Sequence, residues 1–376
     1  MVGALDEYRH DESLFCHGCL LRPRLCPGGH GRCGCVYDGP DRYRCYAGRP
    51  CEVVCLERFD VLRLLEDPGL AALWSGAGAA GPPRALPPFV PTGTWRVRGA
   101  RPGTPWVAVD AGALFRLSRR SGRPLAHLAS PGALRDHLGV PHSARVLAYL
   151  NGTDDKLDGL FTMGPSAAVA LRTAGVDLVG APSYSVYADR PRPDHVFNLR
   201  RMFTVLADAE AQGLPIFPTV YAAGREDVRS WADWVRERPH VWVVGTVAQT
   251  READFSDDLV RVLVRLQEAA GDRDPPLHAV LYGVASPERA RRAHARGLRY
   301  FTCVSSHPAM TALFGARLRW DGRHLRPTPD HGAPRARLLE ANVAEAARAY
   351  DALAEELTDL RPPGAWTRAG GRPRAA

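Results

Sequence analysis

The hydrophobic and polar positions of this chain follow two alternating patterns from about residue 89 onward. Short apolar runs rich in β-branched residues predict strands, and longer segments with one apolar face predict helices. The expected strands are Trp106–Val109, Val146–Leu150, Val176–Val179, Ile216–Val220, Val241–Val244, Ala279–Tyr282 and Tyr300–Val304. An eighth strand is expected at Phe89–Val90 or near Leu318.

Helices are expected between these strands, at Pro131–Leu138, Pro165–Ala174, His195–Gln212, Glu226–Glu237, Ser256–Ala270 and Ser286–Arg296, with a final helix at Arg335–Leu357. Ser256 is the expected N-cap of its helix, and Pro287 suits the first position of the next one. Strands that alternate with helices pair in parallel through crossover connections. Seven or eight such units favour an α/β fold of the (β/α)8 type, a TIM-like barrel, over an open sheet.

Composition divides the chain further. Eight of its nine cysteines fall within residues 1–60, and residues 75–88 are rich in Gly, Ala and Pro. We therefore expect a Cys-rich metal-binding module at 1–60, a helix and linker at 61–88, the TIM-like barrel at 89–330, a C-terminal helix at 331–360 and a disordered Arg, Gly and Pro tail at 361–376.

The clustered cysteines are Cys16, Cys19, Cys26, Cys33, Cys35, Cys45, Cys51 and Cys55, whereas Cys303 lies alone. The residues between them show almost no apolar periodicity, so a hydrophobic core does not account for the cluster. Disulfides, zinc and an iron–sulfur cluster are the three alternatives. The chain has no apolar run long enough to span a membrane, and its acidic, polar start is unlike a secretory signal. A cytoplasmic location is therefore expected, which favours metal ligands over disulfides.

The cysteine spacing offers three chelating pairs, Cys16 with Cys19, Cys33 with Cys35 and Cys51 with Cys55, and leaves Cys26 and Cys45 to complete two four-ligand sets. Eight thiolates allow two zinc sites, two iron–sulfur clusters, or one cluster with spare cysteines. The segment has too little apolar content to fold alone, so the metal is expected to be at least structural.

The net charge of +8 and the pI of about 9.2 permit a nucleic-acid partner. All but one of the 49 Lys and Arg residues are arginine, which also fits a GC-rich coding bias. The single lysine, Lys156, follows Asp154 and Asp155. Its survival against that bias makes it a candidate binding residue, with chance as the alternative.

In a TIM barrel the functional side chains lie at the C-terminal ends of the strands. This rule selects Asp110, Asn151, Lys156, Ser183, Tyr184, Tyr221, Gly245, Thr246, Gly283 and the segment from Thr302 to His307. Each polar residue at such a place has an alternative role as a helix cap or turn residue.

Four segments resemble the tRNA-guanine transglycosylases, in the order in which that family has them. Leu281–Ser305, with L-Y-G-V-A-S-P-E and R-G-L-R-Y-F-T-C-V, is similar to the family's L-M-G-V-G-x-P-E and R-G-x-D-x-F-D-C-V. Trp106–Leu117 resembles its L-T-D-S-G-G-F-Q strand end, Gly175–Tyr184 its G-S-D-I-V-M-A-F-D-E, and Phe217–Val247 its strand, turn, helix and strand. The chain thus looks like a divergent relative of the superfamily of tRNA-guanine and deazapurine DNA-modification transglycosylases.

The resemblance implies a TIM barrel that exchanges a nucleobase in tRNA or DNA. In that family one aspartate attacks the ribose C1′, and a second aspartate handles the proton of the base. Asp110 matches the second, the general acid/base. Thr302 stands where the family has its nucleophilic Asp, Ser183 stands where it has its base-recognising Asp, and the family's C-terminal C-x-C-x-x-C zinc motif is absent.

A threonine hydroxyl is a poor nucleophile without an activating base, so other residues are alternatives for that role. These are Asp155, Asp177, Asp189 and Cys303. Asp177 lies within a predicted strand, where pairing in the core is the stronger interpretation. Asp189 lies in a loop after Tyr187 and is the better candidate.

The sequence therefore favours an enzyme of the base-exchange type, with Asp110, Asp189 and Thr302 as catalytic residues and tRNA or DNA as its partner. One alternative is a catalytically inactive barrel that binds nucleic acid or a protein partner with the help of its metal module. Another is an iron–sulfur redox enzyme. A homodimer and accessory modification subunits stay open, and no membrane partner is expected.

Overall fold

The structure, a computed structural model, describes residues 86–118, 121–184, 192–222, 225–248 and 253–357. In this part of the chain, eight parallel strands form two four-stranded sheets with the orders β1-β10-β9-β8 and β2-β5-β6-β7. The strands are β1 (Phe89–Pro91), β2 (Trp106–Asp110), β5 (Arg145–Tyr149), β6 (Leu178–Gly180), β7 (Ile216–Phe217), β8 (Val243–Val247), β9 (His278–Tyr282) and β10 (Phe301–Ser305).

Two single bridges join these sheets into a ring. Thr92 pairs in parallel with Ala108, which links β1 to β2, and Thr219 pairs in parallel with Gly245, which links β7 to β8. Each of the eight strands therefore has a parallel neighbour on both sides, and their order around the ring follows the chain. This is the strand arrangement of a TIM barrel, which the alternating sequence pattern predicts.

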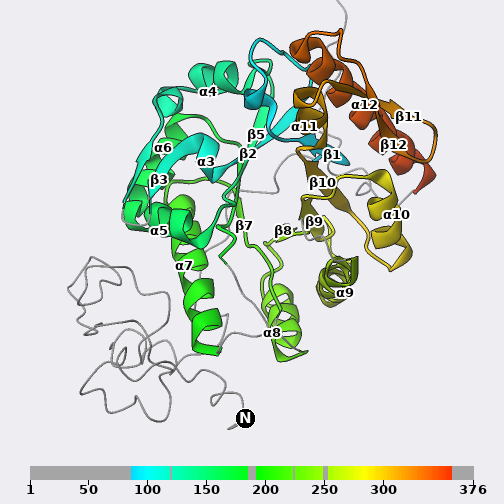
Figure 1. Cartoon of the computed structure of the whole chain (residues 1–376). Helices are drawn as coiled ribbons and strands as arrows, with labels where there is room; N and C mark the ends of the chain where they lie inside the picture. Colours follow the sequence, from blue (N-terminus) through cyan, green and yellow to red (C-terminus); the bar gives the residue numbers. More distant parts are fainter. Residues whose placement is uncertain (1–85, 119–120, 185–191, 223–224, 249–252, 358–376) are drawn as a thin grey trace, which may run out of the picture.

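Helices lie around the strands (Figure 1). They are α3 (Ala111–Leu114), α4 (Pro131–Leu138), α5 (Asp154–Met163), α6 (Pro165–Thr173), α7 (Arg192–Ala211), α8 (Arg225–Arg236), α9 (Ala253–Ala270), α10 (Pro287–Ala295), α11 (His307–Leu313) and α12 (Arg335–Glu356), with 3-10 turns η4 (Thr94–Arg96) and η5 (Ala126–Ala129). Helix α12 packs over β1, where the Tyr350 ring stacks on Phe89 with 4.9 Å between centroids.

Two antiparallel hairpins lie outside the ring of strands. One joins β3 (Phe115–Ser118) to β4 (Ser121–Pro124) within the connection from β2 to β5. The other joins β11 (Ala316–Trp320) to β12 (Leu325–Pro329) between α11 and α12.

Alternate residues of each strand face the inside of the barrel. The buried inner cluster consists of Leu86, Val90, Trp106, Ala108, Leu147, Tyr149, Leu178, Phe217, Val243, Val280, Tyr282 and Val304. The Phe217 ring packs against two glycines, since a Cβ at Gly180 or at Gly245 would lie 2.5 Å from it. Glycine is required at both positions because the ring leaves no room for a side chain. Side chains therefore fill the barrel below its C-terminal mouth.

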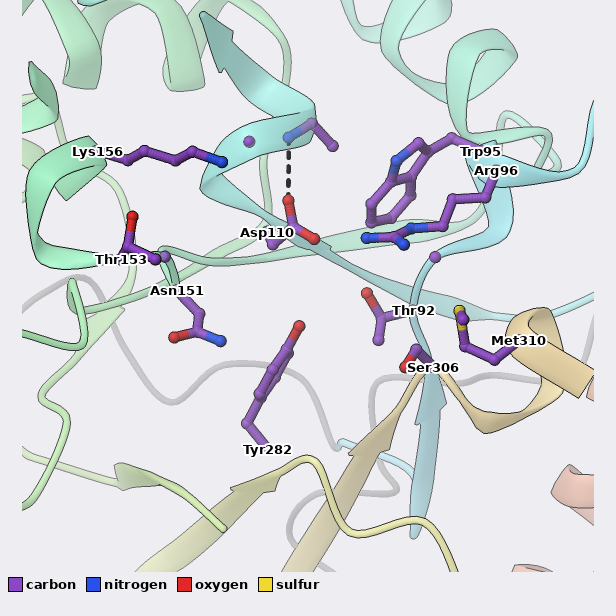
Figure 2. A pocket seen from close by; sticks show the side chains of 14 residues that line it. Thr92, Trp95, Arg96, Asp110, Asn151, Thr153, Lys156, Tyr282, Ser306 and Met310 are labelled. Carbon is purple, nitrogen blue, oxygen red and sulfur yellow. Dashed lines mark hydrogen bonds between the residues drawn. The ribbon is translucent and has the colours of Figure 1, made fainter. Parts of the chain in front are cut away.

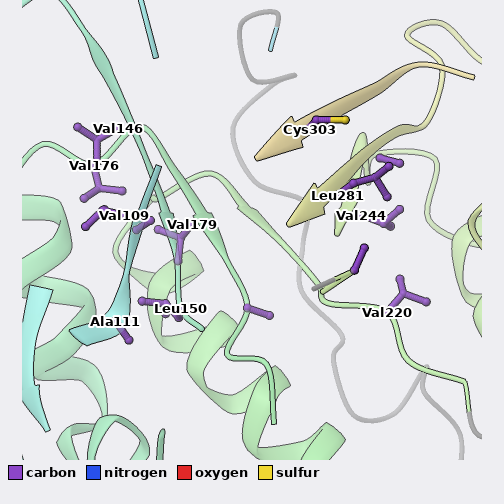
Figure 3. Close-up of a cluster of buried hydrophobic side chains, with 14 of the residues drawn as sticks. Val109, Ala111, Val146, Leu150, Val176, Val179, Val220, Val244, Leu281 and Cys303 are labelled. Carbon is purple, nitrogen blue, oxygen red and sulfur yellow. The ribbon is translucent and has the colours of Figure 1, made fainter. Parts of the chain in front are cut away.

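The outward-facing residues of the strands form a second buried layer beneath the helices. Val109, Val179, Val244 and Leu281 are four of them (Figure 3). Because both faces of each strand are buried in this way, a shift of one residue would place every side chain in the wrong layer. The register is thus well determined, and it fixes which strand-end residues reach the mouth of the barrel.

The predicted strands and helices are confirmed to within three residues at each end. Of the two candidates for the eighth strand, the segment at Phe89–Pro91 is in the ring, whereas Leu318 lies in the hairpin strand β11. Ser256 is not an N-cap, because α9 begins three residues earlier at Ala253. Helix α5 was not predicted, because its polar start and internal Gly159 weaken the apolar pattern.

The predicted module at 1–60, most of the linker at 61–88 and the tail at 361–376 lie outside the described residues. Among the residues that the structure does describe, no helix has both the length and the apolar character needed to cross a bilayer.

Candidate functional site

A cavity of about 820 Å³ lies at the C-terminal mouth of the barrel. It is lined by residues at or just after the ends of five strands and by the starts of α5 and α11: Thr92, Gly93, Trp95, Arg96, Asp110, Gly112, Ala113, Asn151, Gly152, Thr153, Lys156, Tyr282, Ser306 and Met310. TIM barrels place their active sites at this end of the strands. The volume is also in the range of small-molecule sites.

Asp110 lies on the wall of this cavity (Figure 2). It is the last residue of β2 and the N-cap of α3, where its Oδ1 accepts a hydrogen bond from the Ala113 amide at 3.0 Å. Its other carboxyl oxygen points away from that amide, into the cavity (Figure 2). Burial raises the pKa of this carboxyl above its ordinary value, and the nearby backbone amides and the charges of Arg96 and Lys156 oppose the rise. A carboxyl with a raised pKa is suited to donating and accepting a proton near neutral pH.

Two cations extend toward Asp110 from opposite sides of the cavity. Arg96 comes from η4 and Lys156 from the first turn of α5 (Figure 2). Both side chains are exposed at the mouth. Asp110 is the one carboxylate among the described residues that line the cavity. The described lining of the cavity therefore carries an excess of positive charge, which favours a ligand with an anionic group.

A chain of polar side chains crosses the floor of the cavity. Ser183, buried in the loop after β6, donates a hydrogen bond from Oγ to Asn151 Oδ1. The Asn151 and Thr92 side chains lie within hydrogen-bonding reach of the Tyr282 hydroxyl and favour its ionised form. Burial has the larger and opposite effect, and it raises the pKa of Tyr282 to about 12. Tyr282 is therefore a neutral phenol over the whole physiological range.

One side of the cavity is apolar. The Trp95 indole and the Met310 thioether line it above the ends of β1 and β10 (Figure 2). Trp95 follows Gly93, whose left-handed φ of 77° turns the chain after β1. An indole face and a polarisable sulfur form a surface on which a planar ring packs well.

Five residues selected from the sequence line or support this cavity. Asp110, Asn151, Lys156 and Ser306 line it directly. Ser183 does not line it, but it holds Asn151. The sequence rule for strand ends thus locates the part of the site that comes from β2, β5, β6 and β10.

Thr302 lies elsewhere, which corrects the expectation that it shares a pocket with Asp110. It is the second residue of β10, below the layer of Val304, and it is fully buried. Its hydroxyl donates to the Pro87 carbonyl at 2.7 Å and contacts His278 Nε2 at 2.8 Å. It already lay inside the predicted strand Tyr300–Val304, and its selection as a catalytic residue depended on its match to the nucleophilic Asp of the resembling family.

Gly245 and Thr246 also lie away from the cavity. Gly245 makes room for the Phe217 ring inside the barrel. Thr246 is buried, and its hydroxyl donates to the Val220 carbonyl at 3.2 Å. Both residues are internal to β8, which ends at Val247 rather than at the predicted Val244.

Tyr184, Tyr221 and Gly283 have structural roles in the described chain. The buried Tyr184 hydroxyl donates to the Leu157 carbonyl at 2.8 Å, which ties the loop after β6 to α5. The Tyr221 carbonyl accepts a hydrogen bond from Trp231 Nε1 at 2.8 Å. Gly283 turns the chain after β9 with a φ of 91°. None of these three lines the cavity.

The alternative nucleophiles are separated from the cavity or lie outside the described residues. Asp177 pairs with Arg135 at 3.2 Å and accepts from the Val146 amide at 2.8 Å, so the expected pairing is confirmed, although the Asp177 side chain is only half-buried. Cys303 is buried among apolar side chains, and burial raises the pKa of its thiol far above the ordinary value. Asp189 lies outside the described residues, and so does the side chain of Asp155.

The predicted metal ligands Cys16, Cys19, Cys26, Cys33, Cys35, Cys45, Cys51 and Cys55 all lie outside the described residues. Within the part of the chain that is described, no group of three or more His, Cys, Asp or Glu side chains could hold a metal ion.

Sequence reasoning missed several residues of the cavity. Trp95 and Arg96 lie in the connection after β1, a strand that the sequence placed only as one of two alternatives. Tyr282 was assigned to the strand β9 and not to the site. The alternation of inward-facing residues, His278, Val280 and Tyr282, would have placed the Tyr282 side chain at the mouth, because it is the last inward position of β9.

The sequence matches no protein-family profile and no curated protein. One match among solved structures is phosphoribosyl anthranilate isomerase in complex with reduced 1-(o-carboxyphenylamino)-1-deoxyribulose 5-phosphate. That chain is 13% identical with a TM-score of 0.32, and the alignment covers 69% of this chain and all, 100%, of the other. A likeness this distant assigns neither a ligand nor a reaction. The ring of eight parallel strands makes the described chain an α/β protein of the TIM-barrel type, a fold whose members are usually enzymes.

Proposed function

We propose that this chain is an enzyme that acts on a nucleobase of tRNA or DNA, by base exchange or a related nucleoside modification, with Asp110 as its proton-transfer group. One observation carries the proposal: Asp110 lines a cavity at the C-terminal mouth between two cations, Arg96 and Lys156. A nucleotide offers a planar ring for the Trp95 side of the cavity and a phosphate for the cations. The resemblance of four sequence segments to the tRNA-guanine transglycosylases supports the same class of reaction.

The proton balance of base exchange requires one group that works in both directions. As the bond between C1′ and the base nitrogen breaks, neutral Asp110 gives its proton to the leaving base. The incoming base then loses its N–H proton to the Asp110 carboxylate as the new C1′–N bond forms. The carboxyl ends in its starting state, and a pKa raised by burial suits both steps.

The attack on C1′ is assigned differently from the transglycosylase pattern. Thr302 is held by Pro87 and His278 inside the barrel, so it is not part of the proposed machinery. Among the described residues that line the cavity, Asp110 is the one carboxylate. We propose that Asp189, which lies outside the described residues, supplies the second carboxylate: it would form a bond to C1′ as the leaving base departs, and the incoming base would then displace it.

The cysteine cluster is proposed to bind zinc or an iron–sulfur centre that holds residues 1–60 together. With their many arginines these residues would help to grip the phosphate backbone of the nucleic acid. The proposal for the cavity does not depend on which metal is present.

An isotope experiment tests the proposed reaction. The full chain is incubated with tRNA or with DNA and a mixture of 15N-labelled guanine, adenine and hypoxanthine, and the nucleosides are analysed by mass spectrometry after digestion. We expect label in one nucleoside with the wild type and little or none with Asp110→Asn. Salt-dependent binding of nucleic acid with no label incorporated and no nucleoside altered would instead support the inactive binding module.

A further inference from the structure

The Tyr282 side chain is held in place by the barrel beneath it. It is the last residue of β9, and 8% of it is exposed. Its ring stacks on Tyr149, one layer deeper in the barrel, with 4.7 Å between centroids and 15° between planes. Its hydroxyl points up into the cavity (Figure 2). The ring has little freedom, so the position of the hydroxyl oxygen is set by the barrel.

The direction of the hydroxyl proton follows from the neighbouring hydrogen bonds. Ser183 donates to Asn151 Oδ1, which only accepts. The amide nitrogen then lies on the side of Tyr282 (Figure 2). An amide nitrogen only donates, so the Tyr282 oxygen accepts from it. The phenolic proton is left to point toward another acceptor.

Two wall residues and the cavity surround the hydroxyl. Thr92 Oγ1 is within reach of it, although this oxygen is buried and makes no hydrogen bond of good geometry with any described residue. Asp110 is near enough to influence the titration of Tyr282 electrostatically; its Oδ1 accepts from the Ala113 amide, and its other oxygen faces the same cavity. The space in front of the hydroxyl is the cavity itself.

We propose that Tyr282 is a specificity-determining residue, whose hydroxyl donates a hydrogen bond to an exocyclic carbonyl oxygen of the bound base. This inference rests on the proposed function, because it takes the ligand to be a planar base. The site would then prefer oxopurines to purines that lack the oxygen. Ser183 and Asn151 act through Tyr282, as positioning residues.

Binding of four probes tests the inference without any turnover. Guanine and 2-aminopurine differ by the exocyclic oxygen, and so do hypoxanthine and purine. We expect the wild-type chain to bind the oxygen-bearing member of each pair roughly tenfold more tightly, the effect of one neutral hydrogen bond. Tyr282→Phe should bind both members of a pair equally. Ser183→Ala should have a ratio of affinities, with the oxygen over without it, between those of the wild type and Tyr282→Phe.

Tyr149→Phe is the matched control. It removes a buried phenolic hydroxyl that contacts Thr219 Oγ1 at 3.4 Å and does not line the cavity. It should keep the wild-type ratio. The inference is overturned if Tyr282→Phe keeps that ratio, or if the wild type binds none of the four probes.

Failure of this inference and failure of the proposed reaction give different results. Discrimination that depends on Tyr282, without base exchange, would leave the hydrogen bond standing and refute the reaction. Base exchange in a Tyr282→Phe variant that still discriminates would refute the hydrogen bond alone.

Discussion

Replacement of Asp110 separates two roles that its position combines. The carboxyl is the N-cap of α3, through the Ala113 amide, and it is the proposed proton-transfer group. Asn is as good an N-cap as Asp but does not transfer a proton, whereas Ala does neither. Asp110→Asn should therefore lose activity and keep stability, and Asp110→Ala should lose both.

The expected magnitudes differ enough to be resolved. Loss of general acid/base catalysis lowers the rate by about 100-fold to 10,000-fold, or about 3–5 kcal/mol of barrier. Loss of an N-cap lowers the free energy of unfolding by about 1 kcal/mol. A matched control is Ser130→Ala, because Ser130 caps α4 through the Ala133 amide at 3.1 Å and lies outside the cavity. It should lose about 1 kcal/mol of stability and no activity.

The assay pairs urea unfolding with the isotope-exchange measurement for all three variants. The chemical role is supported if Asp110→Asn is as stable as the wild type and incorporates at least 100-fold less label, in line with the lower bound for proton-transfer catalysis. If Asp110→Asn exchanges label at the wild-type rate, Asp110 is only a helix cap and the reasoning is refuted.

Four further predictions follow from the same structure. Burial raises the pKa of Asp110, so its carboxyl favours folding at low pH, and this contribution to stability is lost as the pH rises through the folded-state pKa. The melting temperature of Asp110→Asn relative to that of the wild type should therefore rise with pH. A difference in melting temperature that does not depend on pH would contradict this. Lys156→Ala should weaken binding of GMP about threefold to tenfold without changing guanosine binding, and GMP binding should then depend less on salt concentration. Arg98 is exposed and lies outside this cavity, so Arg98→Ala should change neither the affinity for GMP nor its dependence on salt. Gly245→Ala should lower the free energy of unfolding by about 1–3 kcal/mol because its Cβ would meet Phe217, whereas Gly103→Ala, with open space around it, should be nearly neutral in a denaturation curve. Elemental analysis of the anaerobically purified chain should find zinc or iron, and the absence of both would remove the metal module.

The sequence was sufficient to predict the barrel because its strands are buried on both faces and its helices are amphipathic. Val109 and Val244 face the helices while Ala108 and Val243 face the interior, so whole runs are apolar and easily recognised. Pro131 and Pro287 at helix starts gave accurate boundaries for α4 and α10. The ends of strands were less certain, because the hydrophobic pattern does not say where pairing stops.

That uncertainty explains most of what the sequence did not predict about the site. The site depends on which residue is last in each strand, and a strand that runs one to three residues longer moves a candidate from the mouth into the core. Gly245 was displaced in this way, because β8 runs to Val247, whereas Asp110 lies at the end of β2 as predicted. Thr302 was selected from the family resemblance, which does not show whether a matched side chain reaches the mouth. The convergence of Arg96 and Tyr282 on Asp110 is a tertiary arrangement of distant segments, which no local pattern contains.

The most direct measurement of the central claim is a crystal structure of the full chain with a bound purine base. We expect the base in the cavity at the C-terminal mouth, beside Trp95, with a ring nitrogen about 2.6–3.2 Å from the free carboxyl oxygen of Asp110, the distance that proton transfer requires. A base bound elsewhere, or one in this cavity with no contact to Asp110, would contradict the account.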